Sequence, residues 1–99
     1  MTSLKTSLIN PGADALAGQR IAVVGLGKSG RASLRALADL TRAVLSGWDS
    51  SQEAIDAVAS SGELPEGALD LLRAVPGQDE LAVAVLQWQP EVIILAPGI

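Results

Sequence analysis

Short runs of apolar residues recur along this chain, and longer segments with apolar positions at helical spacing separate them. The first run covers residues 20–25 and closes on glycine, the second covers residues 43–48, and the third covers residues 91–95. The third is densest in β-branched residues, which favour strands. Continuous apolar runs of this length are typical of strands that are buried on both faces of a parallel sheet. The pattern therefore predicts a strand at each run.

Two helices are predicted around the second strand. The segment from the glycine-rich turn to about Leu40 has an apolar face that begins with Gly30 and Leu34, and charged residues occupy another face. This is the pattern of a helix that packs on a sheet. Residues 50–60 form the second helix, with one of its two leading serines as the N-cap.

The rest of the chain predicts one more helix and leaves one segment undecided. Residues 79–89 have apolar positions on one face, and Pro90 stops the helix. The sequence of residues 69–75 fits one or two helical turns or a short edge strand equally well.

The order of these elements predicts the fold class. Strand, tight glycine turn, helix and strand follow one another in the first fifty residues, which is a βαβ unit. We expect a three-layer, Rossmann-like α/β domain with a short, mostly parallel sheet over residues 19–99, after an irregular lead-in over residues 1–18. The chain stops inside a Pro-Gly turn just past a strand, so we expect it to be the N-terminal fragment of a longer multidomain protein.

Composition excludes several kinds of chemistry. The 99 residues contain no Cys and no His, so a thiol nucleophile, a Ser-His-Asp triad and an imidazole-ligated zinc site are excluded. The net charge of −4 argues against a nucleic-acid partner, which usually requires a basic excess. No apolar run reaches the length of a membrane span or of a secretory signal, and we expect a cytoplasmic protein. With Phe and Tyr absent, the core should be aliphatic, and Trp48 and Trp88 are assigned to packing.

The candidate chemistry lies in the turn after the first strand. Gly25, Gly27 and Gly30 form a G-x-G-x-x-G motif between a predicted strand and a predicted helix, and Asp49 ends the next strand nineteen residues later. In such motifs the first glycine permits the tight turn, the second lets a phosphate approach the backbone, and the third lets the helix pack close to the sheet. The helix N-terminus attracts an anion, and the acid accepts hydrogen bonds from a sugar or a base.

Purely structural interpretations stand beside these. The glycine turn also occurs as plain architecture, Asp49 is also explained as a cap for the next helix, and Lys28 and Ser29 are equally explained by phosphate contact or by simple exposure. Gly27-Lys28-Ser29 looks like the end of a Walker A loop, but Ala22 stands where that motif needs glycine. We find no catalytic pair and no metal site.

Three separated segments resemble the N-terminal domain of the Mur ligases, and among these the D-glutamate-adding type. They are residues 23–31 (VVGLGKSGR), residues 48–49 (WD) and residues 92–99 (VIILAPGI). The resemblance covers about residues 15–99. The family motif usually has Ser where this chain has Ala96, so that hydroxyl contact is absent.

The resemblance implies that this domain holds the UDP part of UDP-N-acetylmuramoyl-L-alanine, to which the family's enzymes join D-glutamate in peptidoglycan precursor synthesis. ATP and Mg²⁺ would be bound elsewhere in the parent ligase, with no cofactor and no catalytic residue in this fragment. The implied UDP-binding residues are Gly25, Gly27, Lys28, Ser29, Gly30, Asp49, Ser50, Pro97 and Gly98.

Two other functions remain open from the sequence. A small NAD(H)-binding domain of a dehydrogenase or channel-regulatory protein would use Asp49 for the adenosine ribose. A scaffold domain would use the glycine turn for architecture only. A phosphate loop encoded beyond Ile99 would favour the ligase, further parallel strands the dehydrogenase, and a stop codon the scaffold.

Overall fold

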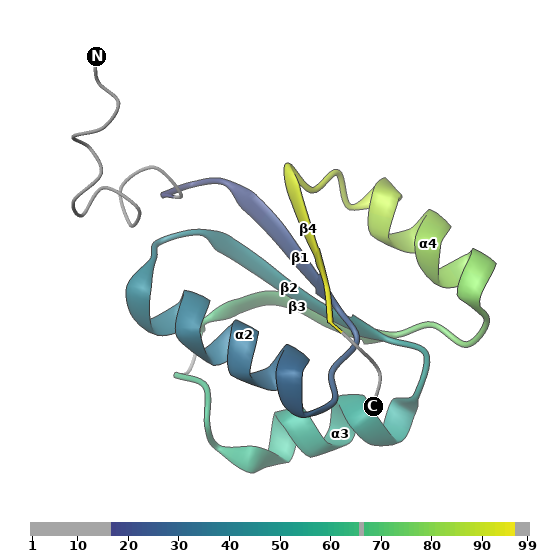
Figure 1. Ribbon diagram of the computed structural model, residues 1–99, viewed down its shortest axis with the longest axis horizontal. Coiled ribbons are helices and arrows are strands. Elements are labelled where there is room, and N and C mark those ends of the chain that lie inside the picture. The colour runs from purple at the N-terminus through teal and green to yellow at the C-terminus, as the bar shows by residue number, and fades with distance from the viewer. Residues whose placement is uncertain (1–16, 66, 97–99) are drawn as a thin grey trace.

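The computed structural model describes residues 17–65 and 67–96 (Figure 1). In chain order the elements are β1 (Arg20–Val24), α2 (Lys28–Leu40), β2 (Val44–Asp49), α3 (Gln52–Ser61), β3 (Leu69–Ala74), α4 (Gln78–Gln87) and β4 (Val92–Leu95). The three predicted strands and the three predicted helices are confirmed, with ends displaced by one or two residues. Most of the predicted lead-in lies outside the described residues.

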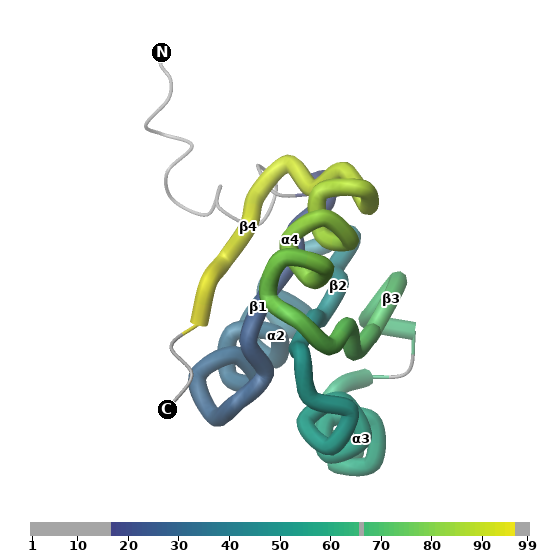
Figure 2. Tube along the Cα trace, turned by 90° about the vertical axis from the view of Figure 1, so that its right-hand side faces the viewer, coloured from purple at the N-terminus to yellow at the C-terminus, as the bar shows by residue number. Residues whose placement is uncertain are grey.

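The four strands form one parallel sheet in the order β3-β2-β1-β4. The register sets Val24 of β1 beside Trp48 of β2 and, on the other side, beside Leu95 of β4. Figure 2 shows β3 and β4 at opposite edges of the sheet. The chain moves from β1 outward to β2 and β3 and then returns to the far side of β1 as β4. The α/β, Rossmann-like fold class is therefore confirmed, with the strand order reversing between β1 and β4.

The undecided segment at residues 69–75 is the edge strand β3. Gly67, with a φ of +80°, precedes it, and Pro76-Gly77 follows it, so the apolar run is too short for a stable helix. Within β3 the side chains of Asp70 and Arg73 are exposed and the other four are half-buried. Because β3 has a neighbouring strand on one side only, its side chains are less covered than those of the central strands.

Helices cover both faces of the sheet, which gives three layers (Figure 1). α2 and α3 lie on one face, over a core that includes Leu34, Leu45 and Ile55. α4 lies on the other face, where Leu81 and Val85 pack against Trp48. In the described part of the chain, no helix has the length and apolar character that a membrane span needs.

Both tryptophans take packing roles, as predicted. Trp48 is only 1% exposed, and its indole Nε1 donates a hydrogen bond to the Ser46 hydroxyl at 2.7 Å. That hydroxyl in turn donates to the carbonyl of Ile21, so the one buried polar side chain described is satisfied. The indole of Trp88 is half-buried, with the Arg20 guanidinium 3.9 Å from its ring centroid.

α4 ends earlier than predicted, at Gln87 rather than at residue 89. Gln89 adopts a left-handed conformation with a φ of +62°, which turns the chain out of the helix before Pro90. The Arg20 side chain donates hydrogen bonds to the carbonyl oxygens of Trp88 and Gln89. These contacts satisfy carbonyls that a helix end leaves without partners.

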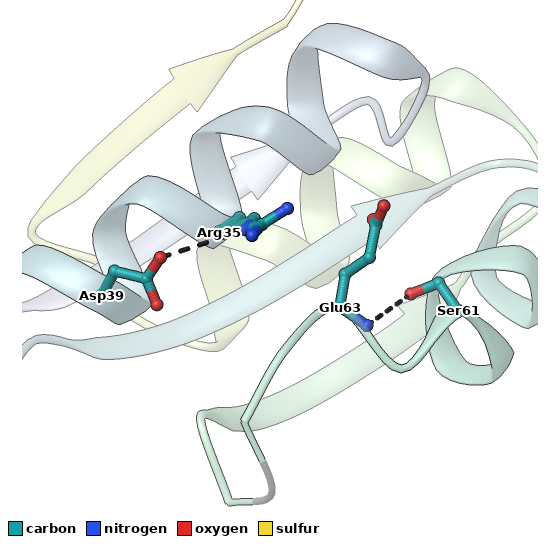
Figure 3. Close-up of polar contacts among 4 residues, drawn as sticks. All are labelled: Arg35, Asp39, Ser61 and Glu63. Atoms are coloured by element: carbon teal, nitrogen blue, oxygen red, sulfur yellow. Dashed lines mark hydrogen bonds and ion pairs between the residues drawn. The ribbon is translucent and has the colours of Figure 1, made fainter.

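The outer face of α2 and the end of α3 carry local polar contacts (Figure 3). Arg35 and Asp39 form an exposed ion pair one turn apart on α2, with 4.0 Å between Nε and Oδ2. At the end of α3, the Ser61 hydroxyl accepts a hydrogen bond from the backbone N–H of Glu63 at 3.1 Å. Exposed pairs of this kind add little stability, so the apolar layers hold the fold together.

Candidate functional site: the glycine turn at the carboxyl edge of the sheet

The glycine turn lies at the carboxyl ends of the parallel strands, next to the point where the strand order reverses. Gly25 follows β1 and still pairs with the sheet, since its N–H donates to the carbonyl of Trp48 at 2.8 Å. On the other side, the N–H of Ala96 donates to the carbonyl of Val24 at 2.9 Å. The turn therefore leaves the sheet between two well-anchored neighbours. Open α/β sheets bind ligands at this place.

Gly25 and Gly30 are required by the protein's own packing. Gly25 has a φ of +97°, and a Cβ there would lie 2.8 Å from the carbonyl oxygen of Ala96. A Cβ on Gly30 would overlap the carbonyl oxygen of Gly25, because the first turn of α2 sits directly on the end of β1. These two glycines have the tasks that the motif predicts for them, the tight turn and the close helix packing.

Gly27 differs from both. Its φ of −73° is open to any residue, and among residues 17–65 and 67–96 no atom lies within 4 Å of the position that its Cβ would take, its chain neighbours apart. The fold therefore imposes no glycine here. An absent side chain beside open space is the feature that the motif requires for a phosphate to approach the backbone.

The N-terminus of α2 has no cap from its own sequence. Gly27 is the N-cap residue and offers no side chain, and the first turn contains no acid. Within residues 17–65 and 67–96, the N–H groups of Lys28, Ser29 and Gly30 have no acceptor. The side chains of Lys28 and Ser29 are exposed beside these groups. Free N–H groups, the positive end of the helix dipole and a lysine together favour an anion.

Asp49 joins the glycine turn to the loop after β2. Its Oδ2 accepts a hydrogen bond from the N–H of Leu26 at 2.7 Å, and its Oδ1 accepts one from the N–H of Ser51 at 2.9 Å. The carboxylate is half-buried at the end of β2. The structure thus brings Asp49 to the turn and shows that both of its oxygens already accept backbone N–H groups.

The remaining predicted residues divide into two groups. Ser50 is exposed in the loop after β2, beside Asp49. Its neighbour Ser51 is the N-cap of α3, and its hydroxyl accepts from the N–H of Ala54 at 3.2 Å, so one of the two serines caps this helix as expected. Pro97 and Gly98 lie outside the described residues.

Two residues that shape this edge, Leu26 and Gly47, are not identified from the sequence alone. Leu26 is 2% exposed, and its buried side chain anchors the turn while its N–H binds Asp49. It packs over Gly47, where a Cβ would meet the side chains of Leu26, Leu34 and Leu72. A signal for Leu26 was present, since it is the single large apolar residue inside the glycine motif.

The described residues also form hollows away from the turn. One, of about 380 Å³, is an apolar groove between α4 and β4 and includes the exposed Ile93 and Leu95. A second, of about 370 Å³, lies between the end of α3 and the start of β3. A third, of about 400 Å³, lies between the end of β3 and α4. No group of three or more acids that would suit a metal ion occurs among the residues described.

Fold and site together define a Rossmann-like α/β domain in which the helix after the glycine turn begins without a side-chain cap. No protein-family model, curated protein or solved structure was found to match the chain.

Proposed function

We propose that this chain is the UDP-binding N-terminal domain of a cytoplasmic ATP-dependent ligase that adds D-glutamate to UDP-N-acetylmuramoyl-L-alanine. The resemblance of residues 23–31, 48–49 and 92–99 to the Mur ligases names this substrate. In this proposal the chain holds the nucleotide part of the substrate. Other domains of the parent enzyme bind ATP, Mg²⁺ and D-glutamate, and this chain alone catalyses nothing.

The single observation that carries the binding role is the open N-terminus of α2. Three consecutive N–H groups lack a described acceptor, and Gly27 leaves the space in front of them unfilled. A diphosphate supplies the acceptors and the negative charge that this arrangement lacks. The nucleoside would then extend along the sheet edge toward Asp49 and Ser50, which follow β2.

NAD(H) is the alternative ligand, and Asp49 is the observation that favours it. An acid at the end of the second strand of a Rossmann domain binds the ribose of NAD. Each Asp49 oxygen accepts one N–H and retains capacity for a second hydrogen bond. A comparison of UDP binding with NAD⁺ binding therefore separates the two functions.

The test is a titration of the 99-residue chain with UDP and with NAD⁺ in parallel, followed by amide chemical shifts. We expect UDP to shift the amides of Gly27, Lys28, Ser29, Gly30 and Asp49, and NAD⁺ to leave them unchanged. If NAD⁺ alone shifts these amides, the dehydrogenase-type function replaces the ligase. If neither ligand shifts them, the proposed binding role is wrong.

Gly27→Val is the matched variant for this titration. The fold has room for the added side chain, so the thermal unfolding midpoint should stay close to that of the native chain. The valine would occupy the space in front of the free N–H groups, so UDP should no longer shift their amides at concentrations that saturate the native chain. Unchanged UDP binding by a folded variant would contradict the placement of the diphosphate.

A further inference from the structure

The carboxylate of Asp49 occupies a position that links two loops of the sheet edge. It accepts the N–H of Leu26 from the loop after β1 and the N–H of Ser51 from the loop after β2. Hydrogen bonds to an ionised acceptor are shorter and stronger than neutral ones, and the 2.7 Å distance to Leu26 fits this class. A single side chain thereby holds both loops that the proposed site uses.

The bond to Leu26 has a direct consequence for the free N–H groups. Leu26 immediately precedes Gly27, so the position of its peptide determines the direction in which the chain enters α2. Glycines at positions 25 and 27 leave the backbone on either side of it intrinsically free. The buried Leu26 side chain, the Asp49 carboxylate and the packing of Gly30 against the Gly25 carbonyl restrain this peptide.

We propose that Asp49 is a positioning residue for the anion site, in addition to any contact that it makes with the ligand. This inference rests on the proposed function. It states that the carboxylate fixes the loop so that the N–H groups of Lys28, Ser29 and Gly30 point to one place. Phosphate binding should then depend on Asp49 even for a ligand that has no sugar and no base.

Inorganic pyrophosphate is the probe that separates positioning from ligand contact. If Asp49 only contacted the nucleoside, Asp49→Ala would weaken UDP binding and leave pyrophosphate binding unchanged or tighter, because a negative charge is removed beside an anion. If Asp49 positions the turn, pyrophosphate affinity should fall by about tenfold, of the order of one lost charge-assisted hydrogen bond. Only the positioning explanation thus predicts weaker pyrophosphate binding.

Two further variants complete the design. Asp49→Asn keeps one acceptor oxygen, so it should restore part of the pyrophosphate affinity lost in Asp49→Ala. Glu53→Gln removes a negative charge from the exposed first turn of α3, where the described contacts include no bond to either loop, and should not weaken pyrophosphate binding. Pyrophosphate binding to Asp49→Ala as tight as to the native chain would overturn the inference.

A ligand-free measurement keeps this inference separate from the proposed function. In Asp49→Ala without ligand, the amide resonances of Leu26 and Ser51 should move upfield as they lose an ionised acceptor, and those of residues 28–30 should shift as the turn relaxes. If residues 28–30 keep their native resonances, Asp49 does not position them, and the inference is wrong. If they shift but neither UDP nor pyrophosphate binds the native chain, the positioning is correct and the proposed ligand is wrong.

Discussion

The N-termini of α2 and α3 lie at the same edge of the sheet, each just after a parallel strand, but only one of them is capped by a side chain. α3 is capped by its own sequence, with the Ser51 hydroxyl accepting from Ala54 and with Glu53 in the first turn. α2 begins at Gly27 with no capping side chain and no acid in its first turn. One helix start is closed by the protein, and the other is left open.

This difference shows where an external anion has a physical reason to bind. A helix start with a side-chain cap has already satisfied part of its N–H groups and offset part of its dipole. At α2 the first N–H groups lack a side-chain acceptor and no acid in the first turn offsets the dipole. Among the described residues, the space beside Gly27 is open to a ligand. The turn is also restrained by the fold, because Gly25 and Gly30 pack closely against backbone atoms and the N–H of Leu26 is bound by Asp49.

Among the substitutions at the start of α2, we expect Gly30→Ala to destabilise the fold most. The added methyl group would overlap the carbonyl oxygen of Gly25, a backbone atom that cannot move without disturbing β1. We expect the free energy of unfolding to fall by about 3 kcal/mol, the upper end of the range for overpacking. Urea unfolding measures the loss.

Gly27→Ala is the control for that experiment, because a Cβ at position 27 meets no neighbour in the part of the chain that the structure describes. Its cost should stay below about 1 kcal/mol, the difference between glycine and alanine as N-cap residues. Equal destabilisation by the two variants would show that helix propensity, and not the contact with Gly25, determines the need for glycine.

A smaller effect is expected at the closed start of α3. Ser51→Ala removes the hydroxyl that accepts from Ala54 and keeps the backbone N–H that binds Asp49. We expect a loss of about 1 kcal/mol of unfolding free energy, typical of a lost N-cap, with UDP affinity unchanged. Calorimetry on the free and UDP-saturated chain measures both quantities. A variant that keeps its stability and loses UDP affinity would instead assign the Ser51 hydroxyl to the ligand.

The sequence predicts the strands, the helices and the glycine turn because each depends on neighbouring residues. An apolar run such as Ile21 to Val23 is stable only when it is buried in the core. Glycine at positions 25 and 30 indicates that the backbone is closely packed there. β3 was undecided because its short apolar run suits either structure until β2 supplies a pairing edge. Local patterns thus define the elements, and pairing decides the ambiguous one.

The bonds of Asp49 could not be predicted in the same way. They depend on the register that places Val24 beside Trp48, which brings the residues after β1 next to the residue that ends β2. Twenty-three positions separate Leu26 from Asp49 in the sequence, and no local pattern reveals which backbone N–H the carboxylate meets. The UDP-binding role of the site residues remains a prediction, and Pro97 and Gly98 lie outside the described residues.

The central claim is tested most directly by measuring the stability and UDP affinity of a variant in which α2 has the cap that it lacks. In Gly27→Asp, the new carboxylate would accept from the first-turn N–H groups, as Ser51 does for α3. We predict that the free energy of unfolding rises by about 0.5 kcal/mol, since a charged cap replaces glycine at a helix start. UDP affinity should fall by at least about tenfold, because like charges would then meet in one place. A more stable chain that binds UDP as well as the native one would contradict the claim that the open start of α2 is the binding site.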